Sequence, residues 1–191
     1  MAVTVVKKVK VNVSAAMCRL AFTTCGPECI AAGCQGNCCD APSLPTGCMI
    51  TIHKTERAVI KARGGVVVNG FLQPKPNTKG CPFKSNGLCG LHFTPDKPFG
   101  CIASPFTLNK NDTLIVRNRY KMLPCYRNAA PKLPAYKAFS SSLVLLFGLN
   151  NFKVLEKHLD TGGGNFEIEM SLAIYTKLKD NDEAKKKHEK V

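Results

Sequence analysis

The sequence predicts an α+β fold that is small, loop-rich and helical in its C-terminal part. Apolar residues make up 45% of the 191 positions, but aromatic residues make up only 7% and Trp is absent, so we expect a modest core for this length. The 15 glycines and 12 prolines gather in the first two-thirds of the chain, which favours loops there. Apolar residues recur at helical spacing only in the last third, which places the helical part there.

Short apolar runs predict four strands in the first two-thirds, at residues 3–13, 49–52, 66–72 and 113–116. One short helix is expected over residues 54–63, with Thr55 as its N-cap and Gly64-Gly65 as a left-handed stop. The segments 18–48 and 73–106 are rich in Cys, Gly and Pro. Residues 18–48 show no regular period, so their order must come from something other than an apolar face.

The last third contains longer elements. Leucine and phenylalanine at helical spacing predict a helix between Tyr136 and Leu159. Residues 166–178 alternate in a manner as typical of a strand as of a helix, and we favour a helix because Glu-Met-Ser-Leu-Ala favours it. The C-terminal tail, residues 179–191, contains both positive and negative side chains without apolar periodicity, which indicates a solvated helical extension or disorder. We therefore expect three parts: 1–130 with the N-terminal strand and the cysteines, 131–178 as a helical part packing on it, and a flexible tail at 179–191.

The expected compartment decides how the eleven cysteines are interpreted. No stretch approaches the roughly 18 continuous apolar residues of a membrane span, and the N-terminus lacks the charged-then-apolar order of a secretory signal. We therefore expect a cytoplasmic protein without a membrane partner. In a reducing cytoplasm, closely spaced cysteines hold metal more often than they form disulfides, and the odd count also disfavours a disulfide framework.

The cysteines fall into two groups, one in each loop-rich region. The candidate ligands are Cys25, Cys29, Cys34, Cys38 and Cys39 in the first group and Cys81, Cys89 and Cys101 in the second, followed by Cys125. A tetrahedral thiolate site needs about four sulfurs, each about 2.3 Å from the metal. Close spacing lets one loop supply two or three sulfurs at low entropic cost, and a second loop completes the site. The adjacent pair Cys38-Cys39 suggests one ligand with one packing thiol, or two metals.

A joint pattern over roughly residues 25–127 carries a family resemblance. Its parts are Cys34-Gln-Gly-Asn-Cys38-Cys39, a short amphipathic helix, Gly80-Cys81-Pro-Phe, Gly87-Leu-Cys89, Lys97-Pro98, Cys101 and Pro105-Phe106. This pattern resembles the CxxCxxCC family of zinc- or iron-chelating proteins, the YkgJ-like cysteine-cluster proteins, whose domain has a counterpart in flagellin lysine N-methylases. The resemblance implies that Cys34, Cys38, Cys39, Cys81, Cys89 and Cys101 are ligands, with Cys25 and Cys29 extending the first group.

The chain departs from that family at two positions. Lys97 stands where the family has an arginine before proline, and Ile102 stands where it has an arginine after the cysteine. Any hydrogen bonding or substrate binding by those arginines is therefore weakened or moved in this chain. His53 and His92 are further ligand candidates, although a lone histidine is more often a surface or hydrogen-bonded residue.

The number of thiolates favours one cofactor over another. Six or more thiolates without a well-placed histidine exceed a single structural zinc site, and thiolate-rich loops with many backbone N–H groups suit iron–sulfur clusters. We therefore favour an iron–sulfur cluster, with zinc as the alternative. Nothing in the sequence shows an open coordination position. A metal that only stabilises a loop-rich domain is therefore as well supported as a metal that takes part in chemistry.

The charge distribution indicates an anionic partner. Residues 53–137 hold fifteen Lys/Arg and three Asp/Glu, a net charge of +12 out of +14 for the whole chain. Such an excess favours binding to an anionic macromolecule, DNA or RNA above all. Cations and aromatic rings that suit phosphate contact and base stacking are interleaved at Arg117, Arg119, Tyr120, Lys121, Tyr126 and Arg127.

Three function classes remain open from the sequence. The leading hypothesis is a metal-binding cysteine-cluster protein, stabilised by that metal, with a basic surface for nucleic acid. The second is an iron–sulfur enzyme or enzyme component in redox chemistry or macromolecule modification, although no methyl-donor motif is present. The third is a structural zinc interaction module. No serine or cysteine has the strand–turn–helix context of a hydrolytic nucleophile.

Overall fold

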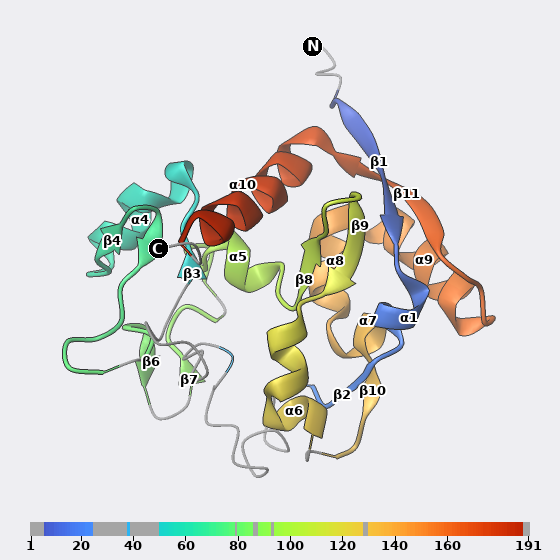
Figure 1. Cartoon of the computed structure of the whole chain (residues 1–191), viewed down its shortest axis with the longest axis horizontal. Helices are drawn as coiled ribbons and strands as arrows, with labels where there is room; N and C mark the ends of the chain where they lie inside the picture. Colours follow the sequence, from blue (N-terminus) through green and yellow to red (C-terminus); the bar gives the residue numbers. More distant parts are fainter. Residues whose placement is uncertain are drawn as a thin grey trace.

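The computed structural model describes residues 6–24, 38, 50–78, 80–85, 88–92, 94–127 and 130–188, with side chains up to residue 180 (Figure 1). The predicted ligands Cys25, Cys29, Cys34 and Cys39 lie outside the described residues. The fold is mixed α+β with helices in the C-terminal part, as the sequence predicts. None of the helices in the described segments is long and apolar enough to cross a membrane.

The largest sheet brings together strands from both ends of the chain. Its order is β11-β1-β9-β8, formed by β11 (Phe166–Ser171), β1 (Lys8–Val13), β9 (Thr113–Val116) and β8 (Phe106–Leu108). β1 runs antiparallel to β11 and parallel to β9. Alternation along β1 buries Val11 and Val13, while Lys8 and Lys10 face solvent and pair with Glu169 (2.8 Å) and Glu167 (2.7 Å) across on β11.

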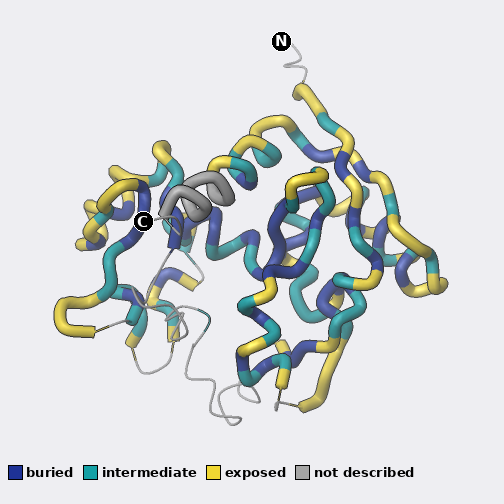
Figure 2. Tube along the Cα trace, viewed as in Figure 1, coloured by how far each residue is buried: buried dark blue, intermediate teal, exposed yellow. Residues whose placement is uncertain are grey.

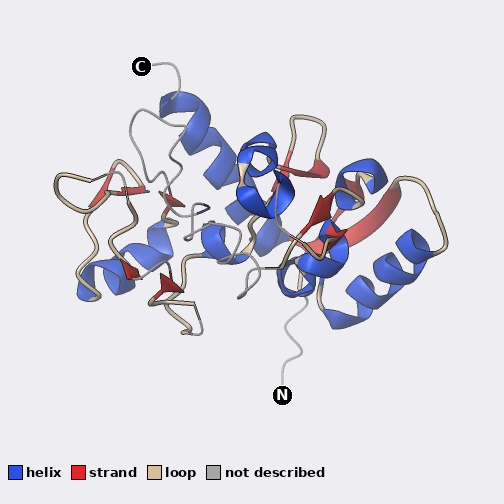
Figure 3. Ribbon diagram, turned by 90° about the horizontal axis from the view of Figure 1, so that it is seen from below, coloured by secondary structure: helices blue, strands red, loops and turns tan. Residues whose placement is uncertain are grey.

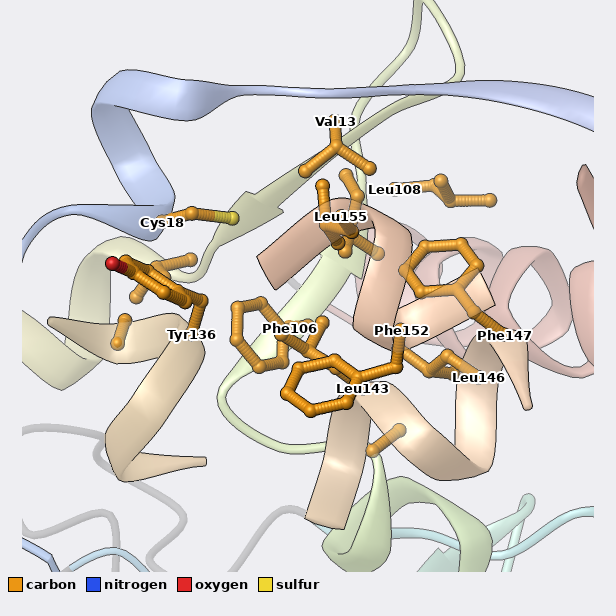
Figure 4. Close-up of a cluster of buried hydrophobic side chains, with 14 of the residues drawn as sticks. Val13, Cys18, Phe106, Leu108, Tyr136, Leu143, Leu146, Phe147, Phe152 and Leu155 are labelled. Carbon is orange, nitrogen blue, oxygen red and sulfur yellow. The ribbon is translucent and has the colours of Figure 1, made fainter. Parts of the chain in front are cut away.

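Short helices build the larger core on this sheet. They are α1 (Ala15–Cys18), α7 (Ala135–Ala138), α8 (Ser140–Phe147) and α9 (Leu149–Asp160). Figure 4 shows Phe106 of β8 among side chains of α8 and α9, with Val13 and Leu108 close by. A small two-stranded sheet, β2 (Ala21–Phe22) with β10 (Leu133–Pro134), closes the lower side of this body.

A second, smaller core lies at the opposite end of the molecule (Figure 3). A three-stranded sheet of order β3-β5-β4 is formed by β3 (Ile50–Thr51), β5 (Phe71–Leu72) and β4 (Val67–Val68). The short helices η1 (Lys54–Glu56) and α4 (Arg57–Ala62) precede β4, and the hairpin of β6 (Lys84–Ser85) and β7 (Leu88–Cys89) follows β5. The buried members of this core are Ile50, Ile52, Ile60, Leu72, Cys81 and Leu91.

The last helix, α10 (Leu172–His188), links the two cores. Leu178 is fully buried in the larger core, Lys179 pairs with Asp112 at the β8–β9 turn, and the Lys177 ammonium lies 5.4 Å from the ring centre of Phe99. At the middle of the helix, Asp180 lies 3.4 Å from His53, which directly precedes η1. In Figure 1 the helix crosses above both parts.

Several predicted elements are confirmed and others are corrected. The strand at 113–116 has the predicted bounds, and the segment 54–62 is helical with Gly64 in the left-handed region (φ 84°). The predicted helix over 166–178 is wrong in its first half, which is strand β11. The predicted helix over 136–159 is interrupted at Gly148, whose φ of 78° and ψ of 158° no helix contains.

Two further local corrections concern the smaller core. The predicted strand at 66–72 is a hairpin, because Asn69 (φ 50°) and Gly70 (φ 83°) form a tight turn that pairs Val68 with Phe71. The N-cap of the first helical turn is His53 rather than Thr55. His53 Nδ1 accepts from the Thr55 backbone N–H, and Glu56 accepts from the His53 N–H (3.1 Å) to complete a capping box.

Candidate thiolate metal centre

Three of the predicted ligands are held by the smaller core. Cys81 is buried just before the β6–β7 hairpin, and its carbonyl accepts from the backbone N–H of Lys84 (3.1 Å). Cys89 lies on β7, directly opposite Lys84. Cys101 lies in α5 (Phe99–Ile102), a single turn that begins after Pro98, whose carbonyl accepts from the Cys101 N–H (2.9 Å). Cys89 and Cys101 are half-buried and pack against the same apolar cluster as Cys81.

The fourth thiol of this group comes from the first cysteine region. Cys38 is half-buried and packs against the larger core, so it lies where the two cores meet. A negative charge on Cys38 affects groups in both the smaller and the larger core. A thiolate at Cys38 raises the pKa of Cys89 and Cys101, and it also raises the pKa of Tyr120 in η2 (Asn118–Met122). Cys38 itself is therefore within electrostatic range of both the second cysteine region and η2.

The four thiols perturb one another's ionisation. Burial raises the pKa of Cys101 to about 12, and the neighbouring thiols of Cys81, Cys89 and Cys38 act in the same direction. The pKa of Cys89 is also raised, first by burial and then by Cys81 and Cys38, while the backbone N–H of Leu91 opposes the shift. Like charges raise each other's pKa only when they are close. Cys38, Cys81, Cys89 and Cys101, called here the four-thiol group, are thus neighbours in the fold.

One cation faces the four-thiol group. Lys97 lowers the pKa of both Cys89 and Cys101, against the stronger effect of burial. Its ammonium lies 3.1 Å from Nδ1 of His92, and the pKa of His92 is lowered by burial and by this lysine. His92 is therefore neutral at physiological pH and lies beside the cation. The sequence names Lys97 only as a departure from a family pattern; its position four residues before Cys101 in a Pro-capped turn is the signal for its role.

The donor set fits a soft metal. Burial and the neighbouring thiols raise the pKa of Cys89 and Cys101, which favours the protonated form of both. A bound zinc ion or iron–sulfur cluster would displace the protons and supply the positive charge that the thiolates need. Thiolate sulfur is the donor that both cofactors prefer. Within the described ranges, no three His, Cys, Asp or Glu side chains stand in a metal-holding arrangement by themselves. The predicted ligands Cys25, Cys29, Cys34 and Cys39 lie outside those ranges.

Two other cysteines are buried in the larger core. Cys18, at the end of α1, is fully buried and its pKa is raised to about 12 by that burial. Cys125, a second-rank ligand candidate, lies in α6 (Pro124–Arg127) among the same core residues, where its carbonyl accepts from the Thr23 N–H (2.9 Å). No disulfide joins any of the six cysteines that the structure describes.

The predicted nucleic-acid residues divide between core and surface. Tyr120 is buried, and burial raises its pKa, so its ring cannot stack with a base. Tyr126 is half-buried against the ring of Phe22, 5.1 Å between centroids, and Arg117 is buried. Lys121 and Arg119 are partly exposed, and Arg127 is exposed.

The exposed cations gather around the η2–α6 corner. Arg127 donates from Nε to the Lys121 carbonyl (3.3 Å) and approaches the sulfur of Met122 (3.1 Å). Lys132, which the sequence does not single out, donates to the Tyr126 carbonyl (2.7 Å) and lies 6.0 Å from the centre of that ring. Met122 and Leu133 are exposed beside them. We call Arg119, Lys121, Arg127 and Lys132 the basic corner.

The comparisons with known proteins give no match: no family model, no curated protein and no solved structure is significantly similar to this chain. The resemblance to the CxxCxxCC family therefore stays a prediction carried by the cysteine pattern.

Proposed function

We propose that this chain binds a metal through clustered cysteine thiolates and uses a neighbouring basic surface to bind an anionic macromolecule, with nucleic acid first. The observation that carries the metal proposal is the four-thiol group. Its members come from three segments of the chain, and Lys97 supplies a compensating positive charge. An iron–sulfur cluster is the favoured cofactor and zinc the alternative.

The small size of the surrounding core supports a stabilising role for the metal. Among the residues that the structure describes, six buried residues form the smaller core, against twenty-five in the larger one. A loop-rich lobe with so little apolar burial gains order when a metal joins its loops. This same observation favours a second candidate, a structural zinc module in which the metal has no chemical task.

The metal proposal has a direct test in matched cysteine variants. We expect Cys89→Ser and Cys101→Ser to lower the metal bound per chain after anaerobic purification by at least about tenfold, since the loss of one thiolate weakens the whole site. Cys18→Ser is the matched control, because Cys18 is buried in the other core, and it should retain the metal. Equal metal content in all three variants would show that the four-thiol group does not bind the metal.

Absorption and metal analysis of the same samples separate the two cofactors. A brown protein with iron and sulfide supports the cluster, and a colourless protein with stoichiometric zinc supports the structural alternative. We place this chemistry in a reducing cytoplasm, where thiolate sites persist.

The nucleic-acid proposal rests on the basic corner and its position. Lys121, Arg127 and Lys132 present their charges on η2, α6 and the segment after it, and Cys38 acts on Tyr120 of the same η2. Cys38 thus lies within electrostatic range of the helix that carries Lys121, and a metal bound there would help to hold the surface that binds the partner.

Salt dependence tests this second part. Binding of random single-stranded DNA or RNA should weaken steeply with salt, at a logarithmic slope of about 0.7 per phosphate contacted. Lys121→Glu with Arg127→Glu should reduce both the affinity and the slope. Lys153→Glu with Lys157→Glu on α9 changes charge equally and should have little effect. No binding at low salt, or equal loss in both pairs, would contradict the proposal.

A further inference from the structure

Among the described residues, the outer strand of the smaller sheet has no strand paired to its far side. β4 stands at one side of the order β3-β5-β4, at the far left of the molecule together with α4 (Figure 1). Across the hairpin, Gln73 N–H donates to the Val66 carbonyl (2.8 Å), and Val68 pairs with Phe71. Hydrogen-bonded pairs alternate with non-bonded ones in an antiparallel ladder. The N–H and C=O of Val67, opposite Leu72, therefore point away from β5.

The two faces of this edge differ. Val67 packs into the smaller core together with Ile60 of α4, so α4 lies on that face. Val66 and Val68 point to the other face and are 61% and 48% exposed. Figure 2 shows burial along the whole chain, with exposed positions in yellow. Exposed branched residues next to an outward N–H and C=O are the features that natural edge strands usually avoid, unless the edge binds a partner.

The positive charge around the β4 edge favours a partner with acidic side chains. Residues 57–95 contain six Lys/Arg and no Asp or Glu. Arg63 is paired with Asp96, whereas Arg57 and Lys61 form no ion pair with a carboxylate in the described segments. The Arg57 guanidinium reaches the β4–β5 turn, where a Cβ on Gly70 would lie 3.3 Å from its Nη2.

We propose that the edge of β4 binds an extended segment of a partner protein as an additional strand, and that this segment alternates apolar and acidic residues. Side chains of an added strand point alternately to the two faces. Apolar side chains would lie on the face of Val66 and Val68, and acidic ones on the face of α4, toward Arg57 and Lys61.

Other occupants fit this edge less well. A second copy of the chain would bring Arg57 and Lys61 against the same cations, and like charges oppose pairing. Nucleic acid would gain phosphate contacts but no stacking, because Val66 and Val68 present no aromatic face. The alternating protein segment is the occupant that uses the backbone groups, the valines and the charge together.

The test uses a fluorescent eight-residue peptide that alternates valine and glutamate, with the whole 191-residue chain as purified, followed by anisotropy. A peptide of the same composition with its valines and glutamates in separate blocks, and a random single-stranded DNA, are the comparison probes. We expect the alternating peptide to bind at least about tenfold more tightly than the block peptide, because only alternation matches both faces. Equal binding of the two peptides, displacement by the DNA at equal concentration, or no binding at millimolar peptide would overturn the proposal.

Two variants locate the binding. Val67→Pro removes the outward N–H without removing a ladder hydrogen bond, and proline is tolerated on edge strands. Arg57→Glu with Lys61→Glu reverses the charge on exposed positions of α4. Each should weaken binding about tenfold, and the charge pair keeps the proposal testable if the proline variant fails to fold. Val154→Ser with Lys153→Glu on α9 is the matched control, since Val154 is 57% exposed. Unchanged affinity in the charge pair, or equal loss in the control, would overturn the proposal.

Discussion

If the proposed metal holds the smaller core together, removing it should expose the thiols of that core and leave Cys18 protected. The smaller core buries few residues, so we expect it to lose order when a chelator removes the metal, whereas the larger core stays folded. Cys101 then becomes a thiol in a disordered loop, and Cys18 remains in its apolar site.

The size of the difference follows from the pKa of Cys18. Burial raises that pKa from 9.0 to about 12. At pH 8 the thiolate fraction of Cys18 is therefore about a thousandfold below that of an ordinary cysteine, and the thiolate is the form that reacts with iodoacetamide. After chelation, Cys101 should be alkylated at least about a thousandfold faster than Cys18.

The assay is pulsed alkylation at pH 8 with and without chelator, followed by mass spectrometry of the Cys18 and Cys101 peptides. The same experiment can refute the reasoning. If the smaller core stays folded without metal, Cys101 keeps its own pKa of about 12 and reacts as slowly as Cys18. A rate ratio near one after chelation would therefore show that the metal does not hold this lobe together.

Three further predictions concern the scaffold. Gly148→Ala should destabilise the fold by about 1–3 kcal/mol, because a φ of 78° with a ψ of 158° suits only glycine. The melting temperature should fall by about 2–4 °C per kcal/mol. Gly164→Ala is the control and should change little, because Gly164 has open space around it and an ordinary φ. The free energy of unfolding should decline above about pH 9, because the Cys18 thiol ionises there in the unfolded chain but keeps its proton up to about pH 12 in the folded one. Urea unfolding at rising pH measures this decline. In Cys18→Ala its slope should be shallower by up to about 1.4 kcal/mol per pH unit. Leu155→Ala, at a fully buried site, should cost about 2–5 kcal/mol in denaturant unfolding, and a cost below about 1 kcal/mol would show that the larger core is not packed as described.

The sequence predicts the strand at 113–116 and the class of the fold because local patterns determine both. It fails at 166–171, where propensity and pairing disagree. Glu167 and Glu169 favour helix in isolation, but their side chains pair with Lys10 and Lys8 on β1, and the alternate residues enter the larger core. The alternation of apolar and polar residues over 166–171 was the signal that indicated a strand. The pairing of these residues with β1 outweighed their local preference for helix.

Single residues account for two other differences. Gly148 separates α8 from α9 inside a pattern whose apolar spacing reads as one helix. The dipeptide Asn69-Gly70 is a strong hairpin signal that divides the predicted strand at 66–72. Both are local features that could be found from the sequence, since each is a residue type that tolerates positive φ.

The site was predictable in part. The sequence predicts Cys38, Cys81, Cys89 and Cys101 all as ligands, and in the fold the first three act electrostatically on Cys101. Spacing does not show that Tyr120 is buried, because burial of a single ring depends on how η2 packs on the rest of the chain. The effect of Lys97 on the pKa of Cys89 and Cys101 likewise depends on the fold, and spacing alone does not show it.

X-ray absorption at the metal edge of the anaerobically purified protein tests the central claim most directly. The account predicts zinc or iron whose first shell consists of sulfur at about 2.3 Å, with that shell weakened in Cys101→Ser and unchanged in Cys18→Ser. A first shell of nitrogen or oxygen, or protein that is folded and free of metal, would contradict it.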